Sequence, residues 1–152
     1  MEVLAQEAKE KILIIPCSGI GKPSGTIGRL ATYYIVEDLF PEETTTICLP
    51  LLVIGDEKAK QLVQKMRVIA IDGCQWECAS KSIQTSGGKL LASLNVLRMY
   101  REHINLKVGS VSNLGPEGEK FTRIVAGKIL KEIEKIRRKQ DVQIKACGNS
   151  CM

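Results

Sequence analysis

The sequence has few aromatic residues and no long apolar run. Its 152 residues include one Trp, three Tyr and two Phe, which is too few for the stacking surfaces that proteins use against single-stranded nucleic acid. No apolar stretch approaches the roughly 20 residues that a membrane-spanning helix needs. The N-terminal segment also lacks the ordered charged and apolar regions of a secretion signal. We therefore expect no nucleic-acid partner, no membrane partner and a cytoplasmic location.

Charge and catalytic side chains narrow the function classes further. The net charge is +5, and its densest cluster is at 135–139, near the C-terminal end of an expected helix, where the helix dipole favours cations. The cluster therefore indicates a solvated helix face. No Ser-His-Asp set or paired carboxylates are recognisable, so catalytic residues stay unknown and the question of enzymatic activity stays open.

Strand and helix patterns alternate along the chain, which is typical of α/β proteins with a largely parallel sheet. Apolar segments predict strands at 11–16, 44–49, 67–72 and 90–94. Periodicity and capping residues predict helices at 26–39, 56–65, 74–84 and 117–139. Residues 104–108 also have a strand-like composition. We expect one three-layer α/β domain over residues 1–140, an open sheet with helices on both faces, followed by a flexible C-terminal tail over 141–152.

Two local signals set helix boundaries within this pattern. Asp56 is the predicted N-cap of the second helix, because a short side-chain oxygen can accept a free backbone N–H there. Gly87 and Gly88 follow the third helix and predict its end.

Three of the expected strands lead into a cysteine. Cys17 follows the first strand, Cys48 the second and Cys74 the third, with Cys78 four residues later. Ligands of open parallel sheets bind outside the carboxyl ends of the strands. Four thiols are therefore predicted to converge at one edge of the sheet.

Four converging thiols fit several kinds of site. Cys74 and Cys78 are spaced to share one face of the expected helix, whose N-terminus favours the thiolate that metals require. Zinc prefers four tetrahedral ligands, and iron–sulfur clusters also take four thiolates. A metal-free redox or sulfur-handling pair at Cys74 and Cys78 is the next interpretation. Core packing is the usual role of a buried cysteine, but it explains four at strand ends less well.

The cysteine segments also resemble a known family. Residues 71–79, IDGCQWECA, are similar to the central motif of the DGC domain family, named for its Asp-Gly-Cys. The segments PCSG at 16–19 and CLP at 48–50 resemble its other two cysteine segments, in the same order, and the similarity extends over about 11–139. The resemblance implies a zinc-binding domain, with no established reaction, whose ligands are Cys17, Cys48, Cys74 and Cys78.

The loop 17–25 is rich in glycine and lies between a strand and a helix, where phosphate-binding loops occur. A Walker loop would need Gly at Pro16 and Ser or Thr at Pro23. We therefore interpret the loop as a tight turn that brings backbone close to whatever Cys17 binds.

The remaining candidates have simpler interpretations. Cys147 and Cys151 form a second CxxxC pair, which we take as dispensable exposed thiols, with a resolving pair or extra metal ligands as alternatives. His103 is expected at a surface helix end. Asp72 is interpreted as a turn residue rather than a base, and Trp76 as packing over the site.

Overall fold

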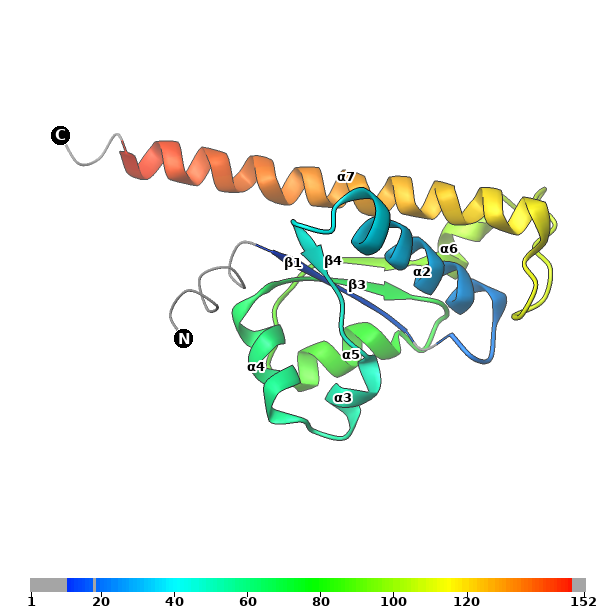
Figure 1. Ribbon diagram of the computed structural model, residues 1–152, viewed down its shortest axis with the longest axis horizontal. Helices are drawn as coiled ribbons and strands as arrows, with labels where there is room; N and C mark the ends of the chain where they lie inside the picture. Colours follow the sequence, from blue (N-terminus) through cyan, green and yellow to red (C-terminus); the bar gives the residue numbers. More distant parts are fainter. Residues whose placement is uncertain (1–10, 18, 149–152) are drawn as a thin grey trace.

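The computed structural model describes residues 11–17 and 19–148, of which 141–148 are described by their backbone only. A sheet of four strands forms its centre, in the spatial order β2-β1-β3-β4. The strands are β1 (Ile12–Pro16), β2 (Thr44–Thr45), β3 (Arg67–Asp72) and β4 (Leu90–Asn95). All pairings between these strands are parallel, which confirms the expected α/β open sheet (Figure 1).

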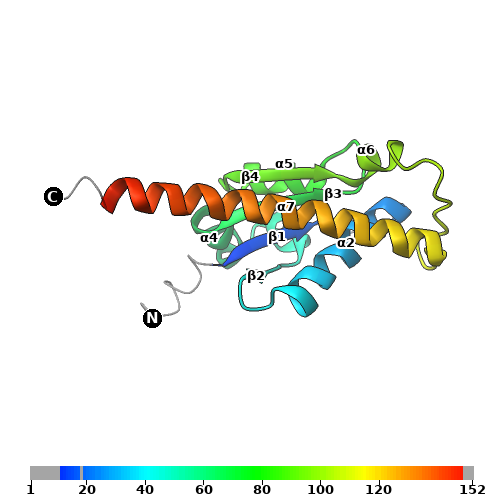
Figure 2. The same cartoon turned by 90° about the horizontal axis from the view of Figure 1, so that it is seen from above.

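Helices cover both faces of the sheet because successive side chains of a strand point to opposite faces. Ile12 and Ile14 of β1 belong to one buried cluster, and Leu13 and Ile15 belong to the other. On the first face lie α2 (Pro23–Tyr33), the π-helical η1 (Tyr34–Leu39), α6 (Val96–Arg101) and α7 (Gly115–Gly148). On the second face lie α3 (Leu49–Val53), α4 (Glu57–Lys65) and α5 (Cys78–Thr85). Figures 1 and 2 show α7 running along the whole sheet.

Several boundaries follow the predictions closely. β3 spans the predicted 67–72, and β4 includes all of the predicted 90–94. The backbone N–H of Ala59 donates to Asp56 Oδ1 at 2.8 Å, so Asp56 caps α4 as expected. Gly87 has a φ of +80°, and α5 ends at Thr85. These boundaries could be predicted because local chemistry sets them.

Other predicted boundaries are wrong, among them the end of the second strand and the starts of two helices. β2 ends at Thr45 and α3 begins at Leu49, so the chain leaves the sheet before Cys48. Pro50 lies in the first turn of α3, where its missing N–H and fixed φ favour a helix start. The first helix begins at Pro23 instead of residue 26 for the same reason. The third begins at Cys78 instead of residue 74.

The strand suggested at 104–108 is also wrong, because this segment is a loop. Local bonds fold it back on α6: the Tyr100 hydroxyl donates to the Leu106 carbonyl at 2.6 Å, and the Leu106 N–H donates to the His103 carbonyl at 2.9 Å. A strand-like composition alone does not make a strand, because β-propensity depends on the surroundings of the segment.

The last helix is longer than predicted. α7 was expected to end at residue 139, but its backbone is helical to Gly148. It carries buried side chains up to Ile136. Within the described ranges, neither α7 nor any other helix is long and apolar enough to cross a membrane. Residues 149–152, including Cys151, lie outside the described residues.

Removing residues 141–152 is expected to leave the stability of the domain nearly unchanged, because Ile136 is the last buried side chain of α7 up to residue 140, and residues 137–140 are half-buried or exposed. The expected fall in melting temperature is less than about 2 °C, which corresponds to about 0.5 kcal/mol for a chain of this size. Thermal unfolding of the full chain and of the truncated chain, followed by circular dichroism, measures the difference. A fall of more than about 5 °C would show that the tail packs on the domain.

Candidate functional site

The four candidate cysteines lie beyond the carboxyl ends of β1, β2 and β3. Cys17 follows β1, and its N–H donates to the Ile71 carbonyl of β3 at 2.9 Å. Cys74 lies two residues after β3, Cys78 is the first residue of α5, and Cys48 is the N-cap of α3. All four are free thiols; Cys17 and Cys74 are half-buried, whereas Cys48 and Cys78 are exposed.

Two adjoining cavities bring these thiols near one another. The first, here named the thiol cavity, has a volume of about 260 Å3 and is lined by Cys17, Cys74 and Cys78. The second, the Cys48 cavity, has a volume of about 380 Å3 and is lined by Cys48 and also by Cys17. Of the four cysteines, Cys17 is the one that lines both cavities.

The early end of β2 explains why Cys48 faces a separate cavity. β2 pairs with β1 only at Ile12 and Leu13. Beyond Leu13, the segment that includes Thr46 and Ile47 no longer hydrogen-bonds to β1, and its residues line the Cys48 cavity together with Pro16. A strand extending to residue 49 would have closed this space.

The thiols do not form a finished metal site. Within residues 11–17 and 19–148, no three Cys, His, Asp or Glu side chains are grouped so that they could hold a metal ion. The donor set is chemically suited to a thiophilic metal, but its positions are not those of a closed site. The assignment of Cys17, Cys48, Cys74 and Cys78 as metal ligands therefore stays a prediction.

Glycines allow three backbone segments to meet around Cys17. A Cβ at Gly73 would lie 2.6 Å from Gly25 Cα and 3.1 Å from Cys17 Sγ, and a Cβ at Gly25 would lie 2.3 Å from Gly19 Cα. Gly19 also has a φ of +70°, which L side chains rarely adopt. The described part of the loop, residues 19–25, is therefore a tight turn, as the sequence predicts, and it packs on the turn after β3.

This packing sets the ionisation of Cys17. Burial raises the pKa of the Cys17 thiol, because a thiolate is poorly solvated there. Backbone hydrogen bonds from Gly73 and Gly19 lower the pKa, whereas the charges of Asp72 and Cys74 raise it. The net effect is a pKa of Cys17 above its ordinary value, so the neutral thiol prevails near pH 7.

Asp72 holds the start of α5 in place. It is the last residue of β3 and only 1% exposed, so it is not the turn residue that the sequence suggested. Its carboxylate accepts hydrogen bonds from the N–H of Ala79 at 2.8 Å, the N–H of Ser80 at 3.2 Å and the hydroxyl of Ser80 at 2.5 Å. The carboxylate thus accepts hydrogen bonds from free backbone N–H groups at the N-terminus of α5, where an acidic group is favourable. The role of Asp72 is therefore structural.

The loop between Cys74 and Cys78 is held by contacts with the end of β4 and with α6. Asn95 donates from Nδ2 to the Cys74 carbonyl at 2.9 Å, and Glu77, which has a φ of +52°, forms an ion pair with Arg98 at 2.9 Å. Cys74 is therefore in a turn, and the predicted pairing of both thiols on one helix face is wrong. Asn95 was missed from the sequence, although it follows the strand predicted at 90–94 and the rule for strand carboxyl ends could have found it.

The other sequence candidates are placed as follows. Trp76 is 64% exposed and lines the thiol cavity, so it borders the site rather than sealing it. His103 follows α6 and is half-buried, with its ring centroid 5.5 Å from that of Phe121. The expectation for Cys147 and Cys151 falls outside the side chains that the structure describes.

The fold and the site define an α/β open-sheet protein with free thiols at the carboxyl edge of a parallel sheet. Comparison with known families gives the particular group. The family model of the DGC domain matches residues 13–113, and the chain belongs to this family. The match ends earlier than the similarity expected from the sequence, before α7. No curated protein and no solved structure matches the chain.

Gly73→Ala is expected to destabilise the protein by about 1–3 kcal/mol, because its methyl group would overlap the backbone of Gly25. Gly127→Ala in α7 is the matched control: its methyl group meets nothing within 4 Å, and alanine favours a helix by up to about 1 kcal/mol. Urea unfolding followed by circular dichroism compares the two variants with wild type. An unchanged midpoint for Gly73→Ala would refute the backbone contact.

Alkylation is expected to be slower at Cys17 than at the exposed Cys48 and Cys78, because only the thiolate reacts. Since the pKa of Cys17 is raised from 9.0, its rate should still increase with pH above that value. Iodoacetamide labelling of metal-free protein across the pH range, with peptide mass spectrometry, measures each rate. A Cys17 rate that becomes constant below about pH 8.5 would contradict the raised pKa.

Proposed function

We propose that the chain is a zinc-binding protein that holds the metal through the thiolates of Cys17, Cys48, Cys74 and Cys78. The observation that supports this most directly is the position of Cys17, which lines both the thiol cavity and the Cys48 cavity. A metal ion bound to Cys17 would have the thiols of Cys74 and Cys78 in the thiol cavity and the thiol of Cys48 in the Cys48 cavity.

Closure of the site requires side-chain movement. Four thiolates bind zinc at Zn–S distances of about 2.3 Å. The side chains as the structure describes them are not grouped closely enough to reach one ion at that distance. The two exposed cysteines are the ones best able to move: Cys48 at the N-cap of α3 and Cys78 at the first residue of α5. Cys17 and Cys74 are half-buried and form the fixed part of the proposed site.

Charge also favours a bound cation at this edge. Asp72 is a buried carboxylate close enough to Cys17 to raise its pKa, so deprotonation of neighbouring thiols adds like charge. A divalent cation offsets this repulsion and makes the thiolates favourable. Because Cys17 is protonated near pH 7, zinc uptake should release protons, and zinc affinity should increase with pH.

Replacement of one ligand tests the proposal. Cys74→Ser should reduce zinc affinity by at least about 100-fold, and added zinc should raise the melting temperature of wild type but not of this variant. Cys48→Ser should have the same effect if the fourth ligand is assigned correctly. Cys151→Ser, in the tail, is the control and should bind zinc like wild type. Metal analysis and thermal unfolding of protein prepared without oxygen measure both effects.

Two other outcomes lead to different functions. A coloured protein that contains iron and acid-labile sulfide would replace zinc with an iron–sulfur cluster, which the same thiolates can hold. Wild type without metal, together with a Cys74→Ser variant of unchanged melting temperature, would refute metal binding. It would favour a thiol redox enzyme, for which the free and neighbouring thiols of Cys17 and Cys74 are the supporting observation.

A further inference from the structure

A third cavity lies beside the thiol cavity and contains no cysteine. Its volume is about 240 Å3, and its walls come from α2, α6, α7 and the loop before α7. The apolar part of its lining is made by Ile27, Leu97, Tyr100, Val108 and Phe121. Neither the metal proposal nor the sequence patterns give this cavity a role.

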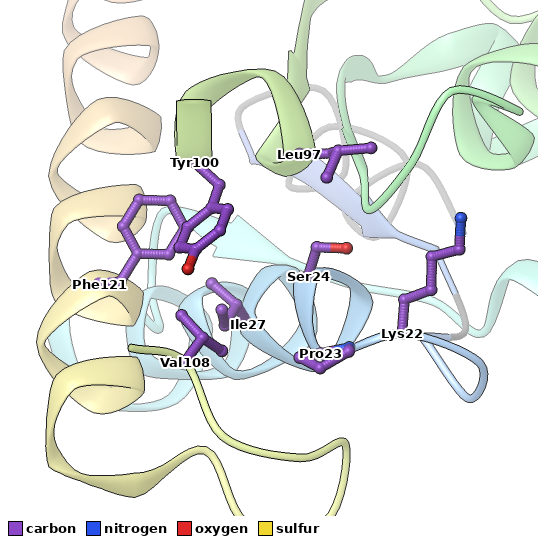
Figure 3. Close-up of a pocket in the computed structure, with 8 residues that line it drawn as sticks. All are labelled: Lys22, Pro23, Ser24, Ile27, Leu97, Tyr100, Val108 and Phe121. Carbon is purple, nitrogen blue, oxygen red and sulfur yellow. The ribbon is translucent and has the colours of Figure 1, made fainter. Parts of the chain in front are cut away.

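The cavity has an aromatic end and a cationic end. Figure 3 shows Tyr100 and Phe121 together at one end and Lys22 at the opposite end. The two rings are in edge contact, with centroids 5.5 Å apart. An apolar body would therefore fit at the first end and a charged group at the second.

The hydroxyls in the lining are already used within the protein. Tyr100 donates to the Leu106 carbonyl at 2.6 Å, and Ser24 donates to the Gly73 carbonyl at 2.5 Å. Lys22, in contrast, is exposed and forms no ion pair with the part of the chain that the structure describes. Its ammonium group is therefore the polar group available to a ligand.

The surroundings of Lys22 favour an anion. Lys22 is the N-cap of α2, and the first turn of this helix has no acidic residue. The partial positive charge of the helix start adds to the charge of the ammonium group. A ligand whose acidic end reaches Lys22 would meet positive potential from both.

We propose that this cavity binds a small organic acid, a carboxylate on a compact aryl or alkyl body. A closed apolar cavity of about 150 Å3 holds benzene, so about 240 Å3 has room for a ring with a short chain. The apolar body lies against Phe121 and Tyr100, and the carboxylate lies at Lys22. This inference goes beyond zinc binding and does not depend on it.

The position of Lys22 connects this site to the thiols. Lys22 lines the thiol cavity as well, and Ser24 joins the start of α2 to Gly73, next to Cys74. The acidic end of a bound ligand would therefore lie at the boundary of the two cavities. Binding of the acid should slow alkylation of Cys17 in metal-free protein.

The experiment uses 3-phenylpropionate as the acid and 3-phenylpropanol as its uncharged counterpart, each titrated into metal-free, chelator-treated full-length protein. Calorimetry gives affinity and stoichiometry, and backbone amide spectra locate the site. We expect one saturable site, with shifts in α6 and around Phe121, and the acid binding more tightly than the alcohol. Lys22→Gln should weaken binding of the acid by about two- to five-fold, the range for an exposed ion pair, and leave binding of the alcohol unchanged.

Two variants separate the cavity from general surface effects. Val108→Trp, in the loop wall, should fill the cavity and abolish binding of both compounds. If circular dichroism shows that this variant is misfolded, Leu97→Trp in the opposite wall repeats the test. Lys107→Gln, an exposed neighbour outside the lining, is the control for loss of charge. No saturable binding, or binding that survives a filled cavity, would overturn the site. Equal affinity for acid and alcohol would overturn the assignment to organic acids.

Discussion

The contact of backbone on backbone between Gly19, Gly25 and Gly73 is the constraint on which the rest of the carboxyl edge depends. It brings the turn after β1 against the turn after β3 with no side chain between them. Cys17 is enclosed by this contact, and the same contact supplies the amides that face its sulfur. Any side chain at these positions would separate the two turns and open the thiol cavity. The positions of the cysteines therefore depend on this close approach of the main chain.

Much of the fold could be predicted from sequence because the central strands are continuous apolar runs, which is typical of strands buried on both faces. β3 and the cap of α4 are examples. The errors have two kinds of cause: a proline in the first turn sets the starts of α2 and α3, whereas contacts outside the local pattern set the end of β2 and the start of α5. β2 was predicted too long because its threonines resemble a strand wherever they occur, whereas pairing with β1 decides its end. The start of α5 was predicted too early because Asp72, six residues before Cys78, caps it through space.

The sequence could predict at which edge of the sheet the candidate site lies, but not the exact positions of its cysteines. The rule that ligands meet strand carboxyl ends brought Cys17, Cys74 and Cys78 to one cavity, since β1 and β3 are adjacent and in register. It placed Cys48 less well, because the strand that should have carried it ends at Thr45. The neighbouring apolar cavity was missed altogether. Its lining residues come from separate helices and one loop. In the sequence, each apolar lining residue looks like an ordinary core residue.

The length of α7 has a consequence for how the protein is made. The residues that match the family end at Asn113, just before the helix that runs along one face of the sheet. That helix shares this face with α2, η1 and α6, and it supplies Phe121, Val125, Ala126, Ile129, Ile133 and Ile136 to the buried cluster around Ile14 and Ile71. While the chain emerges from the ribosome, the part of the core that α7 covers stays open to water until residues 115–136 have been added. The strands of the sheet precede this helix, so the growing chain needs protection from aggregation until the helix packs on them.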